Sequence, residues 1–126
     1  MTYVPSVADR EKLALAKALL EQNLEHTITQ RLLVRKTGLN RFKLTTGFFL
    51  LYGTTVSGYR LHQRMERTKI LLQQPHKPLL EDIATQIGYR GSSLVARFRI
   101  YYGITPHQYR LQWRMELLEK KGTEGK

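Results

Sequence analysis

The sequence from Gly38 to Glu66 recurs from Gly88 to Glu116, at a constant offset of 50 residues and without a gap. The shared positions are glycines, aromatic residues and apolar residues at helical spacing, which low complexity does not produce. We interpret this match as an internal duplication, so the fold must contain two similar units. The matching stretches are Gly38/Gly88, Leu44/Leu94, Phe48/Phe98, Tyr52-Gly53/Tyr102-Gly103, Thr55/Thr105, Tyr59-Arg60-Leu61/Tyr109-Arg110-Leu111 and Arg64-Met65-Glu66/Arg114-Met115-Glu116.

Each copy predicts a short helix, a turn at a glycine, a second helix that ends at a glycine, and a longer helix. A helix, a tight turn and a second helix form the helix-turn-helix unit, whose second helix lies in the DNA major groove. No segment shows convincing strand alternation, so the predicted fold is all-α, with seven helices in two helix-turn-helix subdomains joined by a long linker helix. The expected helices begin at Ser6 or Asp9, Gln30, Asn40 or Arg41, Thr55, Leu80, Ser92 or Ser93, and Pro106, and end near Glu25, Thr37, Tyr52, Gln74, Ile87, Tyr102 and Lys120.

The linker helix is predicted over Thr55–Gln74, a length of ~30 Å, because this stretch holds no proline and its only glycine lies in the first turn. Thr54 or Thr55 can cap its start. Three arginines at helical spacing predict a basic stripe along it: Arg60, Arg64 and Arg67. The expected division of the chain is 1–54, 55–74 and 75–126, with fraying over 1–5 and a polar tail over 121–126.

Charge narrows the class of partner. The net charge of +11 and the pI near 10.2 indicate a polyanionic partner, either nucleic acid or an anionic membrane surface. There is no apolar run of ~18 residues and no secretory signal at the N-terminus. We therefore expect a cytoplasmic protein that binds double-stranded DNA and does not act at a membrane.

The sequence argues against catalysis. It contains no cysteine, which excludes disulfides, thiolate chemistry and Cys-ligated zinc. No phosphate-binding glycine loop is present, and the histidines are scattered, without a pair spaced to bind a metal on one helix. We expect no catalytic residue, no metal and no cofactor. The four histidines are His26, His62, His76 and His107.

The second copy carries a family resemblance in Ile83-Ala84, Ile87-Gly88-Tyr89, Leu94, Ala96-Arg97-Phe98, Tyr102-Gly103-Ile104-Thr105-Pro106 and Tyr109-Arg110. With these residues the chain resembles the DNA-binding domain of AraC/XylS-type transcriptional regulators, over Leu13 to Glu119. The resemblance implies a bacterial-type transcription factor with two helix-turn-helix units and a rigid linker helix. The first copy, in Gly38-Leu39-Asn40, Lys43-Leu44, Gly47-Phe48 and Tyr52-Gly53-Thr54-Thr55-Val56, resembles a branch that responds to iron–siderophore complexes.

Two departures from the family pattern affect base recognition. The stretch from Gly88 to Leu94 is one residue shorter than the second motif usually has, which leaves open which of Arg90, Gly91 and Ser92 points at bases. Ala96 and Thr46 stand where relatives often carry arginine, so the usual bidentate guanine contact is absent there.

The duplication and the resemblance together give the candidate DNA contacts. The base-contact candidates lie off the buried face of each second helix: Arg41, Phe42, Thr45 and Thr46 in the first copy, and Arg90, Ser92, Val95 and Ala96 in the second. Arginine can bind guanine, threonine can contact a base edge, and Phe42 can pack on a thymine methyl group or fold back on the core. The second set has few hydrogen-bond donors. We therefore expect the second unit to contribute more to positioning the protein on DNA than to recognising bases. The phosphate-contact candidates are Arg31, Arg35, Lys36, Lys43, Arg97 and Arg99.

Four further residues give the second helices of the two copies more apolar surface than a DNA-binding face needs: Phe49, Leu50, Ile100 and Tyr101. Core packing is the favoured interpretation, and a partner surface is the alternative. The predicted function is a sequence-specific transcription regulator that binds an asymmetric site through two recognition helices; a sequence-tolerant or architectural nucleic-acid-binding protein is the alternative. RNA polymerase and an effector-sensing domain on a longer chain are additional candidate partners.

Overall fold

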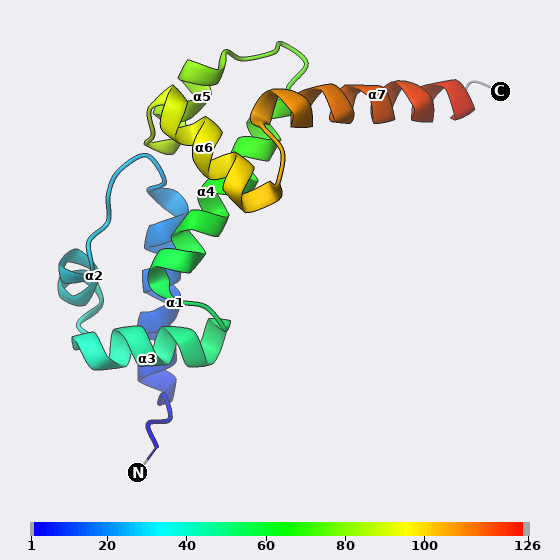
Figure 1. Cartoon of the computed structure of the whole chain (residues 1–126). Helices are drawn as coiled ribbons and strands as arrows, with labels where there is room; N and C mark the ends of the chain where they lie inside the picture. The colour runs from blue at the N-terminus through cyan, green and yellow to red at the C-terminus, as the bar shows by residue number, and fades with distance from the viewer. Residues whose placement is uncertain (1, 125–126) are drawn as a thin grey trace. The chain divides into compact units, whose positions relative to one another are not determined.

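A computed structural model describes residues 2–124 of the chain. Within that range it contains seven α-helices and no strand, which confirms the predicted all-α fold (Figure 1). The helices are α1 (Val7–Gln22), α2 (Gln30–Thr37), α3 (Arg41–Tyr52), α4 (Val56–Leu72), α5 (Leu80–Ile87), α6 (Gly91–Tyr102) and α7 (Pro106–Glu124).

Polar caps and glycines fix most of the helix ends. Five side chains accept a hydrogen bond from the backbone N–H three residues later, at the starts of α1, α2, α3, α4 and α7: Ser6, Thr29, Asn40, Thr55 and Thr105. Four helices end at a glycine in the left-handed region, which has no steric cost for a residue without a Cβ: Gly38, Gly53, Gly88 and Gly103. These local signals account for the accuracy with which α2, α3 and α5 are predicted.

Some predicted boundaries are wrong by a few residues. α1 ends at Gln22 rather than near Glu25, and the Asn23 side chain donates a hydrogen bond to the Leu19 carbonyl at that end. α4 ends at Leu72, two residues before the predicted Gln74, and α6 already begins at Gly91.

Both chain ends are more ordered than predicted. α7 continues to Glu124, so the polar tail expected from Lys121 is helical as far as the structure describes it. Residues 125–126 and Met1 lie outside the described range. The fraying expected at the N-terminus is wrong from Tyr3 onward, because the Tyr3 hydroxyl donates a 2.9 Å hydrogen bond to Asp9 and Pro5 is buried.

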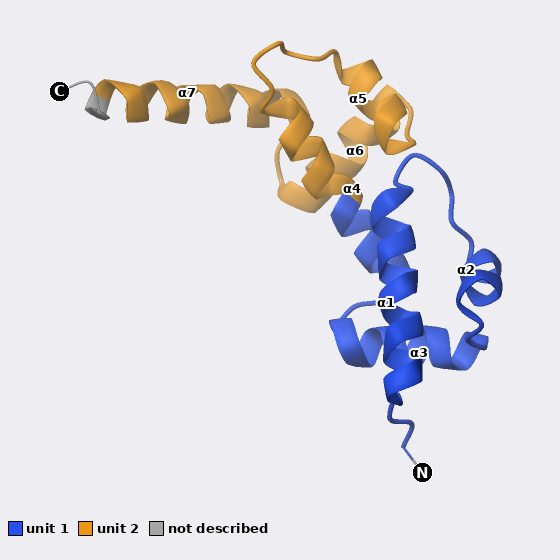
Figure 2. Cartoon of the chain, turned by 180° about the vertical axis from the view of Figure 1, so that it is seen from behind, with its two compact units in different colours: residues 1–63 blue, residues 64–126 orange. Residues whose placement is uncertain are grey.

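The chain forms two compact units, residues 1–63 and 64–126 (Figure 2). Helices α1 to α3 belong to unit 1, and α5 to α7 belong to unit 2. The boundary falls inside α4, so the first turns of this helix serve unit 1 and the later turns serve unit 2.

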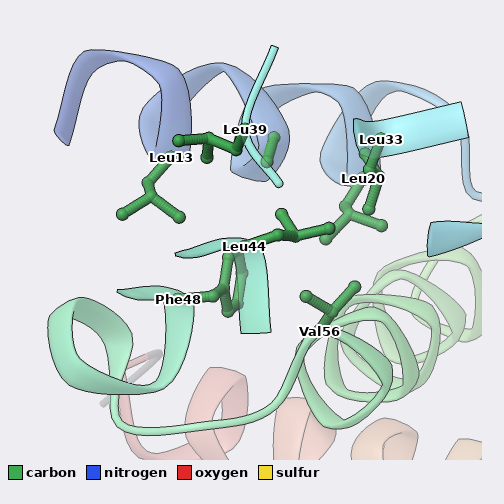
Figure 3. Close-up of a cluster of buried hydrophobic side chains, with 8 residues drawn as sticks. Leu13, Leu20, Leu33, Leu39, Leu44, Phe48 and Val56 are labelled. Carbon is green, nitrogen blue, oxygen red and sulfur yellow. The ribbon is translucent and has the colours of Figure 1, made fainter. Parts of the chain in front are cut away.

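The core of unit 1 lies between α1 and α3 and is closed by residues of α2 and α4 (Figure 3). A Leu or Phe side chain contributes about 1.5–3 kcal/mol when fully buried, so this cluster holds α3 firmly in one orientation. Its buried residues are Leu13, Ala16, Leu20, Leu33, Leu39, Leu44, Phe48 and Val56. The buried apolar residues of unit 2 follow the same plan: Met65, Leu71, Leu72, Ile83, Ala84, Ile87, Leu94 and Phe98.

The structure extends the duplication to α1, which the sequence comparison missed. Lys17 of α1 lies over the rings of Tyr52 and Tyr59, and Lys69 of α4 lies over those of Tyr102 and Tyr109. The tyrosines are 50 residues apart, but the lysines are 52 apart. Helix α1 continues five residues beyond Lys17, whereas α4 continues only three beyond Lys69, and this difference of two residues hid the match from a fixed offset.

Candidate nucleic-acid interface

The outer face of α3 presents the first set of candidate base contacts. Leu44 and Phe48 are fully buried on the inner face, and Asn40 caps the helix through a 2.7 Å hydrogen bond from the Lys43 N–H. Arg41 and Phe42, in the first turn, are exposed, and Thr45 and Thr46, one turn later, are partly exposed. The structure thus places all four predicted residues away from the core.

Thr45 has its hydroxyl hydrogen engaged inside the helix. The hydroxyl donates to the Arg41 carbonyl at 2.9 Å, four residues back. Such a bond is common for threonine in helices and leaves the side chain with an acceptor and a methyl group but no free hydrogen. Thr45 is therefore poorly suited to donate a hydrogen bond to a base.

Phe42 is not folded back on the core, since 60% of it is exposed. Its ring is 5.7 Å from that of Tyr3, whose hydroxyl donates to Asp9. The Lys43 ammonium is 3.4 Å from the same carboxylate. The hydrogen bond from Tyr3, with help from Lys43, lowers the pKa of Asp9.

Two consequences follow for the predicted contacts. Tyr3, which the sequence analysis did not select, supports Phe42 from the side, and no local pattern signals this because the two residues are brought together only by folding. Lys43 also has part of its charge compensated by Asp9, so it is a weaker phosphate candidate than the exposed arginines.

The outer face of α6 carries smaller side chains. Arg90 occupies the N-cap without a side-chain capping bond, and Gly91 is the first helical residue. Arg90, Ser92 and Ala96 are exposed and Val95 is partly exposed. Arg90 therefore precedes the helix, and Ser92 lies in its first turn.

Arg97 and Arg99 differ in their surroundings. The Arg97 guanidinium is 5.0 Å from the Tyr89 ring, and that of Arg64 is 4.7 Å from the same ring. Such cation–π contacts contribute about 0.5–2 kcal/mol and hold Arg97 along the surface of unit 2. Arg99 is exposed one turn from the C-terminus of α6.

The phosphate candidates on α2 lie together only in part. Arg31 and Arg35 line one surface hollow of about 530 Å³, together with Thr29, Leu32 and Val34. Both arginines and Lys36 are exposed. Arg31 and Arg35 can therefore approach one polyanion jointly, and Lys36 is not part of that hollow.

The basic stripe predicted along α4 is wrong for two of its three residues. Arg60 donates a 2.9 Å hydrogen bond to the His26 carbonyl, and Arg64 is only 6% exposed. In unit 2, Arg110 likewise donates to the Pro78 carbonyl at 2.6 Å. The arginine of each repeated Tyr-Arg pair thus anchors the loop that precedes α2 in unit 1 and α5 in unit 2. Of the predicted stripe, only Arg67 is exposed.

Core packing is also the wrong interpretation of the four additional apolar residues. Their exposed fractions are Phe49 56%, Leu50 52%, Ile100 85% and Tyr101 39%. Phe49 and Leu50 line a hollow of about 300 Å³ with Thr45, Thr46 and Thr55. The C-terminal halves of α3 and α6 therefore carry exposed apolar surface.

Over residues 2–124 no group of three or more histidine, aspartate or glutamate side chains is placed to bind a metal ion. In the same range no helix is long and apolar enough to cross a membrane.

Comparisons with known proteins give a consistent result. A family model described as a helix-turn-helix domain matches residues 33–112. An AraC-type transcriptional regulator from Chromobacterium violaceum is 28% identical over 86% of this chain and 96% of that chain, with a TM-score of 0.74. The C-terminal domain of the two-component response regulator yesN from Fusobacterium nucleatum is 30% identical over 77% of this chain and 95% of that chain, with a TM-score of 0.69. No match is found among curated proteins.

The DNA-binding domain of AdpA, solved in complex with a target DNA, shares the fold with a TM-score of 0.75 at 22% identity, over 83% of this chain and 95% of that chain. None of these relatives supports the narrower resemblance to a siderophore-responsive branch. The family match covers more than half of the 126 residues. The chain therefore belongs to the AraC/XylS-type helix-turn-helix family and is a DNA-binding domain of a transcription regulator.

Proposed function

We propose that this chain binds one asymmetric DNA site as a monomer, with α3 and α6 in successive major grooves. The observation that carries the proposal is the duplication, because the two helix-turn-helix units follow each other in the same order and are not halves of a symmetric dimer. The shared fold with the AdpA domain, which was solved on its target DNA, supports this use of the fold.

The proposed roles follow from exposure. The base contacts are Arg41, Phe42, Thr45 and Thr46 from α3, and Arg90, Ser92, Val95 and Ala96 from α6. Phosphates are bound by exposed cations: Arg31, Arg35, Lys36, Arg97 and Arg99, with a smaller contribution from Lys43. With about four to seven such contacts, log K should fall against log salt with a slope of about −4 to −6.

The proposed spacing of the site follows from the groove repeat of DNA, because one continuous helix, α4, joins the two units and α3 and α6 are proposed to enter grooves on the same side. Successive major grooves on one side of DNA are ~34 Å apart. We therefore expect two short determinants about 10–11 bp apart, centre to centre.

The test is selection from random duplexes, followed by footprinting and titration on the selected site. We expect a defined asymmetric sequence, and a 5 bp insertion between its two halves should abolish tight binding because it turns them to opposite sides of the DNA. A flat selection result would instead favour the sequence-tolerant binder. Unchanged affinity after the insertion, or a salt slope shallower than about −2, would also contradict the proposal.

A further inference from the structure

The outer face of α3 is unusually apolar for a surface that meets DNA. Phe42, Thr45, Thr46 and Phe49 recur at i, i+3, i+4 and i+7, which places them on one side of the helix, away from the buried Phe48. Phe42 and Phe49 are each more than half exposed. An apolar surface of this kind marks a binding surface more often than an isolated exposed leucine does.

This face has few groups that can donate a hydrogen bond to a base. The Thr45 hydroxyl hydrogen is engaged with the Arg41 carbonyl, and the phenylalanines have no polar atoms, which leaves the Thr46 hydroxyl as the remaining donor of these four residues. What the face offers instead is methyl groups and ring edges. In the major groove the complementary apolar feature is the 5-methyl group of thymine, which distinguishes thymine from the other three bases.

The shape of the face matches that chemistry. Thr45, Thr46 and Phe49 line the hollow of about 300 Å³, and Leu50 and Thr55 complete it. At the other end of the face, Phe42 lies against the Tyr3 ring, and this contact reduces the side-chain freedom that binding would remove. A preorganised apolar surface with a shallow hollow suits small apolar groups better than it suits phosphates.

We infer that α3 recognises its half of the site through thymine 5-methyl groups, which contact Phe42, Thr46 and Phe49, and that Arg41 supplies the polar contact at the start of the helix. This inference rests on the proposed placement of α3 in a major groove. The corresponding face of α6 is Ser92, Val95, Ala96 and Arg99, without an aromatic ring. We therefore assign thymine recognition chiefly to unit 1.

The test removes methyl groups from the DNA and leaves the protein unchanged. Each thymine of the selected site is replaced by deoxyuridine, one at a time, and the Kd of the full chain is measured at fixed salt. A buried methyl group is worth about 0.8 kcal/mol, so each contacted thymine should weaken binding about fourfold. Thymines in the DNA that flanks the two determinants are the matched control and should change the Kd by less than about twofold.

A protein variant tests which side chain contacts the thymine methyl group. Thr46→Ser removes one methyl group and keeps the hydroxyl, so it should weaken binding about as much as one deoxyuridine does. If the two methyl groups touch, the combined loss should be smaller than the product of the separate losses. Phe49→Ala should likewise reduce the sensitivity to deoxyuridine.

The outcomes separate this inference from the proposed function. Specific binding that is insensitive to deoxyuridine throughout the α3 half would overturn the inference and leave the proposed function standing. Loss of sequence preference altogether would overturn both. If Phe42→Ala and Phe49→Ala also left DNA affinity unchanged, the inference would fail and this face would be assigned to a protein partner.

Discussion

The two units have the same core and different outer faces. Phe48 packs its ring 4.7 Å from Tyr52 and 5.6 Å from Tyr59, and the corresponding distances from Phe98 in unit 2 are 4.7 Å and 5.8 Å. The duplicated core has therefore kept its geometry. The exposed positions of the two helices have diverged. Those of α3 carry aromatic residues and threonines, and those of α6 carry small residues and arginines.

Differences also appear next to the core. A Cβ on Gly47 would lie 2.7 Å from Leu13 Cδ1, so α3 packs against α1 without room for a side chain. Unit 2 has Arg97 at the corresponding position, where its guanidinium lies over Tyr89. The same position of the repeat thus lies at a helix contact in unit 1 and at the surface in unit 2.

The hydroxyls of the paired tyrosines differ as well. Tyr59 donates to Glu21, whereas Tyr109 accepts a 2.7 Å hydrogen bond from Gln73. Burial, reinforced by Glu21, raises the pKa of Tyr59. In unit 2 it is Tyr102 whose pKa is raised, by burial and by Glu66. The tyrosine that donates to a glutamate thus stands at different positions of the repeat, Tyr59 in unit 1 and Tyr102 in unit 2.

The largest expected effect tests the equivalence of the cores. Phe48→Ala and Phe98→Ala should each lower the free energy of unfolding by about 3–5 kcal/mol, because both rings are fully buried. Urea denaturation measures this, with the exposed Phe49→Ala as a control expected within about 0.5 kcal/mol. A difference of more than about 2 kcal/mol between the two core variants would contradict the equivalence.

The next prediction sharpens the contrast between the recognition helices. Arg41→Ala should cost about 1–3 kcal/mol of binding and relax base preference at one end of the site, because Arg41 is the cation of the α3 outer face. Ala96→Ser on α6 should have little effect. Titrations on the selected site and its single-base variants would show the difference. Equal weakening of all sequences would instead make Arg41 a phosphate ligand.

Helix packing supplies a smaller effect. Gly47→Ala should destabilise unit 1 by about 1–2 kcal/mol, because crowding against the buried Leu13 outweighs the better helix propensity of alanine. Arg97→Ala, the matched change in unit 2, should cost at most about 1 kcal/mol through the lost contact with Tyr89. Thermal unfolding would compare the stability of the two variants. A Gly47→Ala protein that is more stable than the unchanged chain would show that the Leu13 side chain moves aside.

The smallest predicted effect concerns the helix caps. Asn40→Ala should lower stability by about 1 kcal/mol because it removes the cap of α3. Arg90→Asn should raise stability by about 0.5–1 kcal/mol, because α6 has no side-chain cap at that position. Both are measured by denaturation without DNA, since Arg90 is also a candidate contact. No gain from Arg90→Asn would mean that the α6 start cannot adopt the capped geometry.

Features set by neighbouring residues were predictable from the sequence. The bounds of α2, α3 and α5 follow from caps, glycine stops and apolar spacing, and the duplication gives the fold class. Features set by distant residues were not. The burial of Arg64 depends on Tyr89, and the placement of Phe42 depends on Tyr3. The exposure of Phe49 was missed because a phenylalanine beside the core residue Phe48 was assigned to the core, although its spacing from Phe42 places both on the outer face of α3.

The division of α4 between two cores has a consequence for how such domains can change. Tyr59 packs in unit 1 and Met65 packs in unit 2, within one continuous helix. One codon inserted between Gln63 and Arg64 would leave each core with all of its own residues, yet it would turn the later part of the helix by about 100° relative to the earlier part. In the proposed binding mode, a single insertion would therefore change the relative placement of the two half-sites without changing a proposed base-contact residue.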